Sequence, residues 1–239
     1  MDMILPFFYK EDIDASTHLV VLDEDTSKHV VQVLRMQNGE QLQLSNGRGN
    51  LFTGEITDNH KKKCAVTILQ TSNPKPQTSN IAIGISLLKN HNRFEWFLEK
   101  ATELGVQRII PLICERTEKQ HFRYERMKGI LVSAMLQSQQ CWLPVLAEPV
   151  SYNKFLQNSE RTYQQKFIAH CIEEEKRGLA DMINENLSSK IILIGPEGDF
   201  SPTEIDMAVK DHYIPVSLGN TRLRTETAGV VAATLLCLV

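Results

Sequence analysis

Two arginines, Arg222 and Arg224, stand in a short loop directly before a predicted helix that opens at Thr225. The first turn of a helix has backbone N–H groups without intrahelical partners, so donors and guanidinium groups would meet here. Positive side chains at this end oppose the helix dipole, and stability alone would not favour them. The loop is therefore a candidate for anion binding or catalysis. The alternative is a structural salt-bridge cluster of both arginines with Glu197 and Glu226.

A glycine turn follows an apolar run twice near the C-terminus. Gly195-Pro196-Glu197-Gly198 comes after the run 191–194, and Gly219 comes after the run 215–218. Each unit has the pattern of a buried strand, a glycine turn and a helix that begins at the turn. One such corner is more often structural than functional. Two of them side by side, at the carboxyl ends of adjacent parallel strands, would form one ligand crevice.

Metal chemistry is not indicated by the residue spacing. His29 and His121 have no ligand partners at useful spacing. Five cysteines lie far apart without paired spacing, which predicts reduced, buried thiols in a cytoplasmic protein. They are Cys64, Cys114, Cys141, Cys171 and Cys237. A zinc site is therefore not expected.

The composition is that of an ordinary soluble globular protein, with 42% hydrophobic and 23% charged residues. No apolar run approaches the length of a membrane span, and the first residues lack the features of a signal peptide. The net charge of −3 gives no global sign of a nucleic-acid partner, so any RNA would need a local basic surface. The run Lys61-Lys62-Lys63 most often marks a solvated hairpin tip, and RNA contact is the less common interpretation.

Residues 1–72 are predicted to form a small β-rich domain. Strands are expected at 18–22, 40–44, 51–56 and 64–69, with a turn cluster at 45–50. The stretch 25–36 has helical spacing, with Val30, Val33 and Leu34 on one side. Several short strands and one helix indicate a small barrel. The polar, proline-bearing stretch 73–80 is typical of a linker.

Residues 81–239 alternate strand and helix patterns, which predicts an α/β domain with a parallel sheet. Strands are expected at 81–88, 106–114, 166–171, 191–194 and 215–218, and helices at 93–104, 125–140, 152–156, 179–187, from 201 onward and from 225 to the end. Ser201-Pro202-Thr203-Glu204 has the pattern of a capping box with proline at the first helical position. The last helix has almost no charge after Glu226, so it should be buried nearly all round, within the chain or in a subunit interface.

Several of these segments, in this order, resemble the ribosomal RNA small subunit methyltransferase E family. The resemblance rests on 99–106 (EKATELGV), Pro111, Glu115-Arg116, 194–198 (IGPEG), Leu218-Gly219 and 223–228 (LRTETA). Val33-Leu34-Arg35-Met36, with Gly39 and Gly47, looks like the first domain of that family. Each motif alone is weak, but their combination spans nearly the whole chain. Asp199 departs from the pattern, because the family usually has a further glycine there.

The resemblance implies an N-terminal PUA-like barrel and a C-terminal α/β domain of the SPOUT superfamily, whose chain end is threaded into a trefoil knot. It also implies a homodimer that methylates N3 of one uridine in 16S rRNA of the small ribosomal subunit, with S-adenosyl-L-methionine as donor. By similarity the donor pocket comprises Leu193, Ile194, Gly195, Pro196, Glu197, Gly198, Leu218, Gly219, Leu223, Arg224 and Thr225.

A mechanism follows as a hypothesis. Arg224 would offset negative charge developing on the uracil oxygens, and Glu226 or Glu197 would orient Arg224 or serve as the base. Candidate RNA contacts are Arg35, Lys61, Lys62, Lys63, Gln137 and Arg222. Two alternatives stay open: a ribose 2′-O-methyltransferase of the same superfamily, and a non-catalytic RNA-binding protein that uses the same fold.

Overall fold

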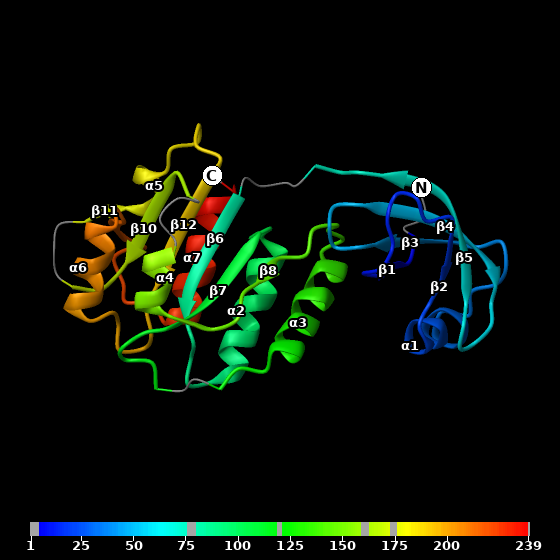
Figure 1. Ribbon diagram of the computed structural model, residues 1–239, viewed down its shortest axis with the longest axis horizontal. Coiled ribbons are helices and arrows are strands. Elements are labelled where there is room, and N and C mark those ends of the chain that lie inside the picture. The colour runs from blue at the N-terminus through cyan, green and yellow to red at the C-terminus, as the bar shows by residue number, and fades with distance from the viewer. Residues whose placement is uncertain (1–4, 76–79, 119–120, 159–162, 173–175, 239) are drawn as a thin grey trace. The chain divides into compact units, whose positions relative to one another are not determined.

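The structure, a computed structural model, describes residues 5–75, 80–118, 121–158, 163–172 and 176–238 (Figure 1). The chain divides into two compact units. Met1–Pro76 and Met135–Leu143 form the first, and Gln77–Ala134 and Pro144–Val239 form the second. The predicted linker 73–80 spans this break, and its residues 76–79 lie outside the described residues.

A five-stranded sheet builds the first unit, in the order β1-β3-β4-β5-β2. Its strands are β1 (Phe7–Tyr9), β2 (Leu19–Val21), β3 (Gln41–Ser45), β4 (Leu51–Asp58) and β5 (Ala65–Ser72). β1 pairs with β3 in parallel, and the other neighbours are antiparallel. The period-two pattern of β3 puts Leu42 and Leu44 into a core with Phe52 and Ile56 of β4. The first unit therefore has a hydrophobic core of its own.

The helix predicted over 25–36 is shorter and changes its winding. An α-helix, α1 (Glu24–Lys28), begins at its N-cap Asp23 and passes into a π-helix, η1 (His29–Val33). Leu34 N–H donates to the carbonyl of His29, five residues back (2.9 Å). The wider turn breaks the predicted 3.6-residue stripe. Val30 is fully buried, whereas Val33 is 66% exposed and Leu34 is 42% exposed, so the prediction of one shared face was wrong.

A segment distant in sequence, 135–143, belongs to the first unit. Gly49 N–H donates to Cys141 O (2.8 Å), and Leu143 N–H donates to Gly47 O (2.9 Å). Both glycines have positive φ, and a Cβ on either would collide with Leu143 or Trp142. Nothing in the sequence pattern indicated this return of the chain, because the contacts run through the backbone of a turn.

The second unit contains an eight-stranded sheet in which every pairing is parallel. The strand order is β11-β13-β10-β12-β6-β7-β8, with β9 paired to β7. The strands are β6 (Asn80–Ser86), β7 (Arg108–Ile113), β8 (Val145–Leu146), β9 (Val150–Ser151), β10 (Gln165–Ala169), β11 (Arg177–Gly178), β12 (Ser189–Ile194) and β13 (Ile214–Ser217). The predicted parallel sheet is present. β12 and β13 are not adjacent, however, because β10 lies between them.

Six helices accompany this sheet in the described part of the unit: α2 (His91–Glu103), α3 (Tyr124–Gln137), α4 (Tyr152–Asn158), α5 (Leu179–Met182), α6 (Pro202–Lys210) and α7 (Thr225–Leu238). The helix predicted over 179–187 was wrong beyond Met182. There, side chains bind the backbone instead, since Asn186 N–H donates to Asn184 Oδ1 (3.0 Å) and Asn184 N–H donates to Gln165 Oε1 (2.9 Å). Such local bonds compete with a helix.

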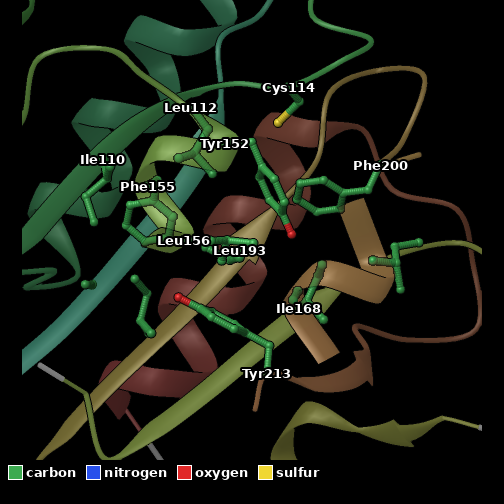
Figure 2. Close-up of a cluster of buried hydrophobic side chains, with 14 residues drawn as sticks. Ile110, Leu112, Cys114, Tyr152, Phe155, Leu156, Ile168, Leu193, Phe200 and Tyr213 are labelled. Atoms are coloured by element: carbon green, nitrogen blue, oxygen red, sulfur yellow. The ribbon is translucent and has the colours of Figure 1, made fainter. Parts of the chain in front are cut away.

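Side chains pack on both faces of the sheet. On one face Leu193 of β12 joins a cluster with Tyr152 and Phe155 of α4 and with Phe200 (Figure 2). On the other face α7 packs against α2 and β6, and Gly229 of α7 faces Phe97 and Ile85 in this contact. The buried residues of α7 in this contact include Ala232, Ala233 and Leu236, but its outer residues are half-buried and Leu238 is 67% exposed. Within one chain, α7 is therefore not buried on all sides.

Candidate active site

A cleft of about 710 Å³ opens in the second unit at the carboxyl ends of three strands. The ends of β10, β12 and β13 line it together with the first turn of α7 and one side chain from α2. Its residues are Arg93, Ala169, His170, Cys171, Lys176, Ile194–Glu197, Asp199, Val216–Thr225 and Ala228. The crevice expected between the two glycine turns therefore exists, but the end of β10 forms a third wall between them, which the sequence analysis missed.

The turn after β12 is anchored in the core beneath it. Phe200, which is 1% exposed, packs against the ring of Tyr152 with centroids 5.3 Å apart (Figure 2). A Cβ on Gly195 would lie 3.0 Å from the Phe200 nitrogen, so a larger residue would push the turn away from its anchor. The main chain at Gly195 thus forms the cleft wall directly.

The loops after β6 and β7 hold the same turn from the side. Lys89 N–H donates to Glu197 Oε1 (3.1 Å), and Arg116 Nη1 donates to Gly198 O (2.7 Å). Lys89 is also paired with Glu118 (2.7 Å), whose hydrogen bond raises the pKa of Lys89. Glu197 is exposed, so its carboxylate can still contact a ligand. These contacts fix the turn before any ligand binds.

The helix that follows this turn begins as predicted. Ser201 is the N-cap of α6, its N–H donates to Glu204 Oε2 (2.9 Å), and Pro202 stands in the first turn. Glu204 is 5% exposed, and its other oxygen accepts the Glu115 N–H after β7 (2.9 Å). The capping box is confirmed, and its Glu204 also connects the loop after β7 to the start of α6.

The arginine loop after β13 is open to solvent. Gly219 has a φ of +132°, which only glycine adopts without strain. Arg222 and Arg224 are exposed and line the cleft. Within the described part of the chain, neither forms an ion pair, so the alternative of a salt-bridge cluster is not seen there. Two uncompensated positive charges at the mouth of a cleft favour a negatively charged ligand.

Glu226 is oriented toward a different arginine from the one expected. Its carboxylate, on a residue 6% exposed, lies 3.5 Å from Nε of Arg93 on α2. Among the described residues its Oε2 has no hydrogen-bond partner. Arg93 lines the cleft and its side chain is 38% exposed. A buried carboxylate thus holds a guanidinium at the cleft wall, a pairing that residue spacing could not indicate.

The last residue of β10, Ala169, and the next two, His170 and Cys171, supply the third wall. Cys171 N–H donates to Asp199 Oδ2 (2.7 Å), and Lys176 Nζ donates to the carbonyls of His170 (2.7 Å) and Ile172 (2.6 Å). Cys171 is exposed and Cys237 is half-buried, so the expectation of buried thiols was wrong for these two and is confirmed for Cys64, Cys114 and Cys141. Cys171 stands on the loop that follows the carboxyl end of β10, beyond the layers that cover the sheet.

Most residues expected in the donor pocket line the cleft: Ile194, Gly195, Pro196, Glu197, Leu218, Gly219, Leu223, Arg224 and Thr225. Leu193 is fully buried in the core beneath, and Gly198 faces the Arg116 side chain.

No group of three His, Cys, Asp or Glu side chains is placed to hold a metal in the described ranges. No described helix is both long and apolar enough to span a membrane.

The other candidate RNA contacts lie in the first unit. Arg35 has a φ of +58° and is exposed, as are Lys61, Lys62 and Lys63 between β4 and β5. The loops that carry them are joined, since Asn59 N–H donates to Asn38 Oδ1 (2.8 Å). Lys62 is partly neutralised by Glu24 (3.3 Å). Gln137, the last residue of α3, is exposed. Arg35 and the three lysines therefore lie on two loops that contact each other, and these loops are called the basic region below.

Comparison with known proteins finds a matching family for each of the two units. The family described as RNA methyltransferase domain matches residues 74–237, and the RNA methyltransferase PUA domain matches residues 22–69. The ribosomal RNA small subunit methyltransferase E of Synechocystis is 29% identical over 85% of this chain and 68% of its own length.

Two solved structures extend the match to the whole fold. The probable rRNA-methyltransferase of Porphyromonas gingivalis is 37% identical, with a TM-score of 0.88 over 97% of this chain and 98% of that one. The ribosomal RNA small subunit methyltransferase E of Neisseria gonorrhoeae, bound to S-adenosyl methionine, is 28% identical, with a TM-score of 0.85 over 97% and 96%. The predicted fold class, a SPOUT-type parallel α/β sheet after a PUA-like barrel, is confirmed. The chain belongs to the RNA methyltransferase family that includes ribosomal RNA small subunit methyltransferase E.

Proposed function

We propose that the protein transfers the methyl group of S-adenosyl-L-methionine to N3 of one uridine in the 16S rRNA of the small ribosomal subunit. The observation that carries this proposal is the cleft at the ends of β10, β12 and β13. It occurs in a chain whose fold matches that of a ribosomal RNA small subunit methyltransferase E bound to S-adenosyl methionine.

The residues of the cleft fit the methyl donor. Ile194, Pro196, Val216, Leu218 and Leu223 offer apolar surface to an adenosyl group. The backbone of the two glycine turns offers donors and acceptors close to the ligand. When bound, the donor supplies a methyl group already activated by its sulfonium. The chain therefore has mainly to align that methyl group with the acceptor.

The acceptor atom sets a second requirement. N3 of neutral uracil carries a proton, and negative charge develops on the uracil oxygens as that proton leaves. Arg224, exposed at the cleft mouth, is placed to offset this charge. Arg93 is a further guanidinium on the cleft wall, and Glu226 acts on it as a positioning residue. Glu197 is the exposed carboxylate of the cleft and thus the better candidate for a base.

The basic region of the first unit would supply RNA affinity through Arg35, Lys61, Lys62 and Lys63, with Gln137 as a further contact and Arg222 at the cleft. The half-buried outer face of α7, with Val231, Leu235 and the exposed Leu238, supports a homodimer. An rRNA substrate favours a cytoplasmic location. The threading of the chain end into a trefoil knot stays a prediction from the superfamily.

Mapping the methyl group tests the proposal. The protein and labelled donor are incubated with small ribosomal subunits from cells that lack the enzyme, and the rRNA is digested for nucleoside mass analysis. We expect 3-methyluridine at one position. A methyl group on ribose would favour the 2′-O-methyltransferase alternative, and a protein that binds rRNA but gives no heat with the donor would be a non-catalytic binder.

A further inference from the structure

The most unusual backbone position in the cleft is Asp199. Its φ is +65°, in the left-handed region that a non-glycine residue occupies only at a cost. Glycine would adopt the same conformation without strain. A carboxylate at this strained position therefore points to a role for the side chain itself.

The Asp199 side chain makes two hydrogen bonds that a glycine could not make. Oδ1 accepts the N–H of Phe200 (2.8 Å), the residue that anchors the turn in the core. Oδ2 accepts the N–H of Cys171 at the end of β10 (2.7 Å). Bonds of this kind to an ionised acceptor are stronger than those between neutral groups. One side chain thus connects two of the three walls of the cleft.

Lys176 also binds this segment. Its ammonium group donates to the carbonyls of His170 (2.7 Å) and Ile172 (2.6 Å), which flank Cys171 in the chain. Beyond Ala169 this backbone no longer pairs with β12 or β13. The two charged side chains therefore replace the sheet ladder as the partners of His170, Cys171 and Ile172.

We propose that Asp199 and Lys176 are positioning residues that hold His170 and Cys171 as a preformed wall of the methyl-donor cleft. This inference rests on the proposed use of S-adenosyl-L-methionine. A preformed wall needs no ordering when the donor binds, so the pair raises affinity for the donor rather than the rate of methyl transfer.

Calorimetric titration with S-adenosyl-L-methionine measures this effect. Asp199→Gly keeps the backbone conformation and removes both acceptors, so we expect Kd to rise by about tenfold or more. Asp199→Asn keeps one acceptor oxygen and tolerates the same φ, so its Kd should lie between those of the wild type and Asp199→Gly. Lys176→Met should weaken binding similarly. In each variant KM for the donor should rise while kcat at saturating donor stays within about twofold.

Two matched controls lie on α6, where Asp206 and Lys210 are exposed. Asp206→Asn and Lys210→Met should leave Kd within about twofold of the wild type. Wild-type affinity in both Asp199→Gly and Asp199→Asn would overturn the inference. If the glycine variant does not fold, the asparagine variant decides by the same criterion.

Hydrogen exchange of the Cys171 amide tests the geometry without donor or RNA. We expect exchange to be about tenfold faster or more in Asp199→Gly and unchanged in Asp206→Asn. An unchanged rate in Asp199→Gly would overturn the inference. A wild-type protein that gives no heat with the donor would instead refute the proposed function, and Cys171 exchange would still report on the wall.

Discussion

Replacing Gly229 by alanine tests how closely α7 packs against the rest of the second unit. A Cβ at this position would lie 2.6 and 2.7 Å from two ring carbons of Phe97 on α2, and 3.0 Å from Cδ1 of Ile85 on β6. Phe97 and Ile85 are both 0% exposed, so neither side chain can move into solvent to make room. The added methyl group must displace the helix or strain the core.

The expected magnitude is the difference between two opposing effects. Glycine to alanine inside a helix stabilises by about 0.8–1 kcal/mol, whereas a methyl group forced into a filled core destabilises by about 1–3 kcal/mol. Gly229→Ala should therefore lower the free energy of unfolding by up to about 2 kcal/mol. Because α7 begins at the cleft, its displacement should also weaken donor binding.

Gly129→Ala is the matched control. Gly129 lies within α3, is exposed, and has open space where the alanine Cβ would stand, with no neighbouring atom within 4 Å of that point. The same substitution should here raise the free energy of unfolding by about 0.8–1 kcal/mol. Thermal and urea unfolding followed by circular dichroism would compare the two variants. The melting temperatures should differ by roughly 2–12 °C. Equal stabilisation by both substitutions would refute the close packing of α7.

Three further outcomes are expected. Arg224→Ala should lower kcat by about a hundredfold or more while Kd for the donor stays within about threefold. Arg222→Ala should mainly raise KM for rRNA. An equally severe loss of donor affinity in Arg224→Ala would make Arg224 a pocket residue instead. Burial raises the pKa of the Cys114 thiol from 9.0 to about 12. The stability that the buried neutral thiol contributes is therefore fully present below pH 9 and is lost between pH 9 and 12, where the unfolded chain ionises first. Cys114→Ala should make the fall in unfolding free energy above pH 9 shallower by up to about 1.4 kcal/mol per pH unit, and an unchanged slope in urea titrations would contradict this. Replacing Lys61 and Lys63 by glutamine should reduce the slope of log K for rRNA against log salt by about 1.4–1.8, and an unchanged slope would exclude them from the contact.

The elements that sequence patterns predicted well are governed by local interactions. The capping box at Ser201 and Glu204 forms because both partners lie within one helical turn. Helix α2 ends before Gly105, whose φ of +88° is cheap only for glycine. The continuous apolar run of β12 is fully buried, as expected for a strand covered on both faces. Short-range geometry alone specifies these features.

The features that were missed depend on contacts between distant segments. The place of β10 between β12 and β13 follows from sheet order, and apolar runs of similar composition do not encode which of them are neighbours. The pairing of Glu226 with Arg93, rather than with Arg224 nearby in sequence, joins two helices 133 positions apart by residue number (226 − 93). Cys171 reads as buried in the apolar pattern, yet it stands on a loop beyond the end of its strand.

The sequence by itself determined the strand–turn–helix units, the glycines that bring backbone to a ligand, and the arginines before α7, because each is a property of residues within a few positions of one another. Only the tertiary structure decided that a third strand end completes the cleft and that Asp199 joins it to the turn after β12. The physical reason is that sheet order and hydrogen bonds between loops depend on how the whole core packs. No single segment carries that information.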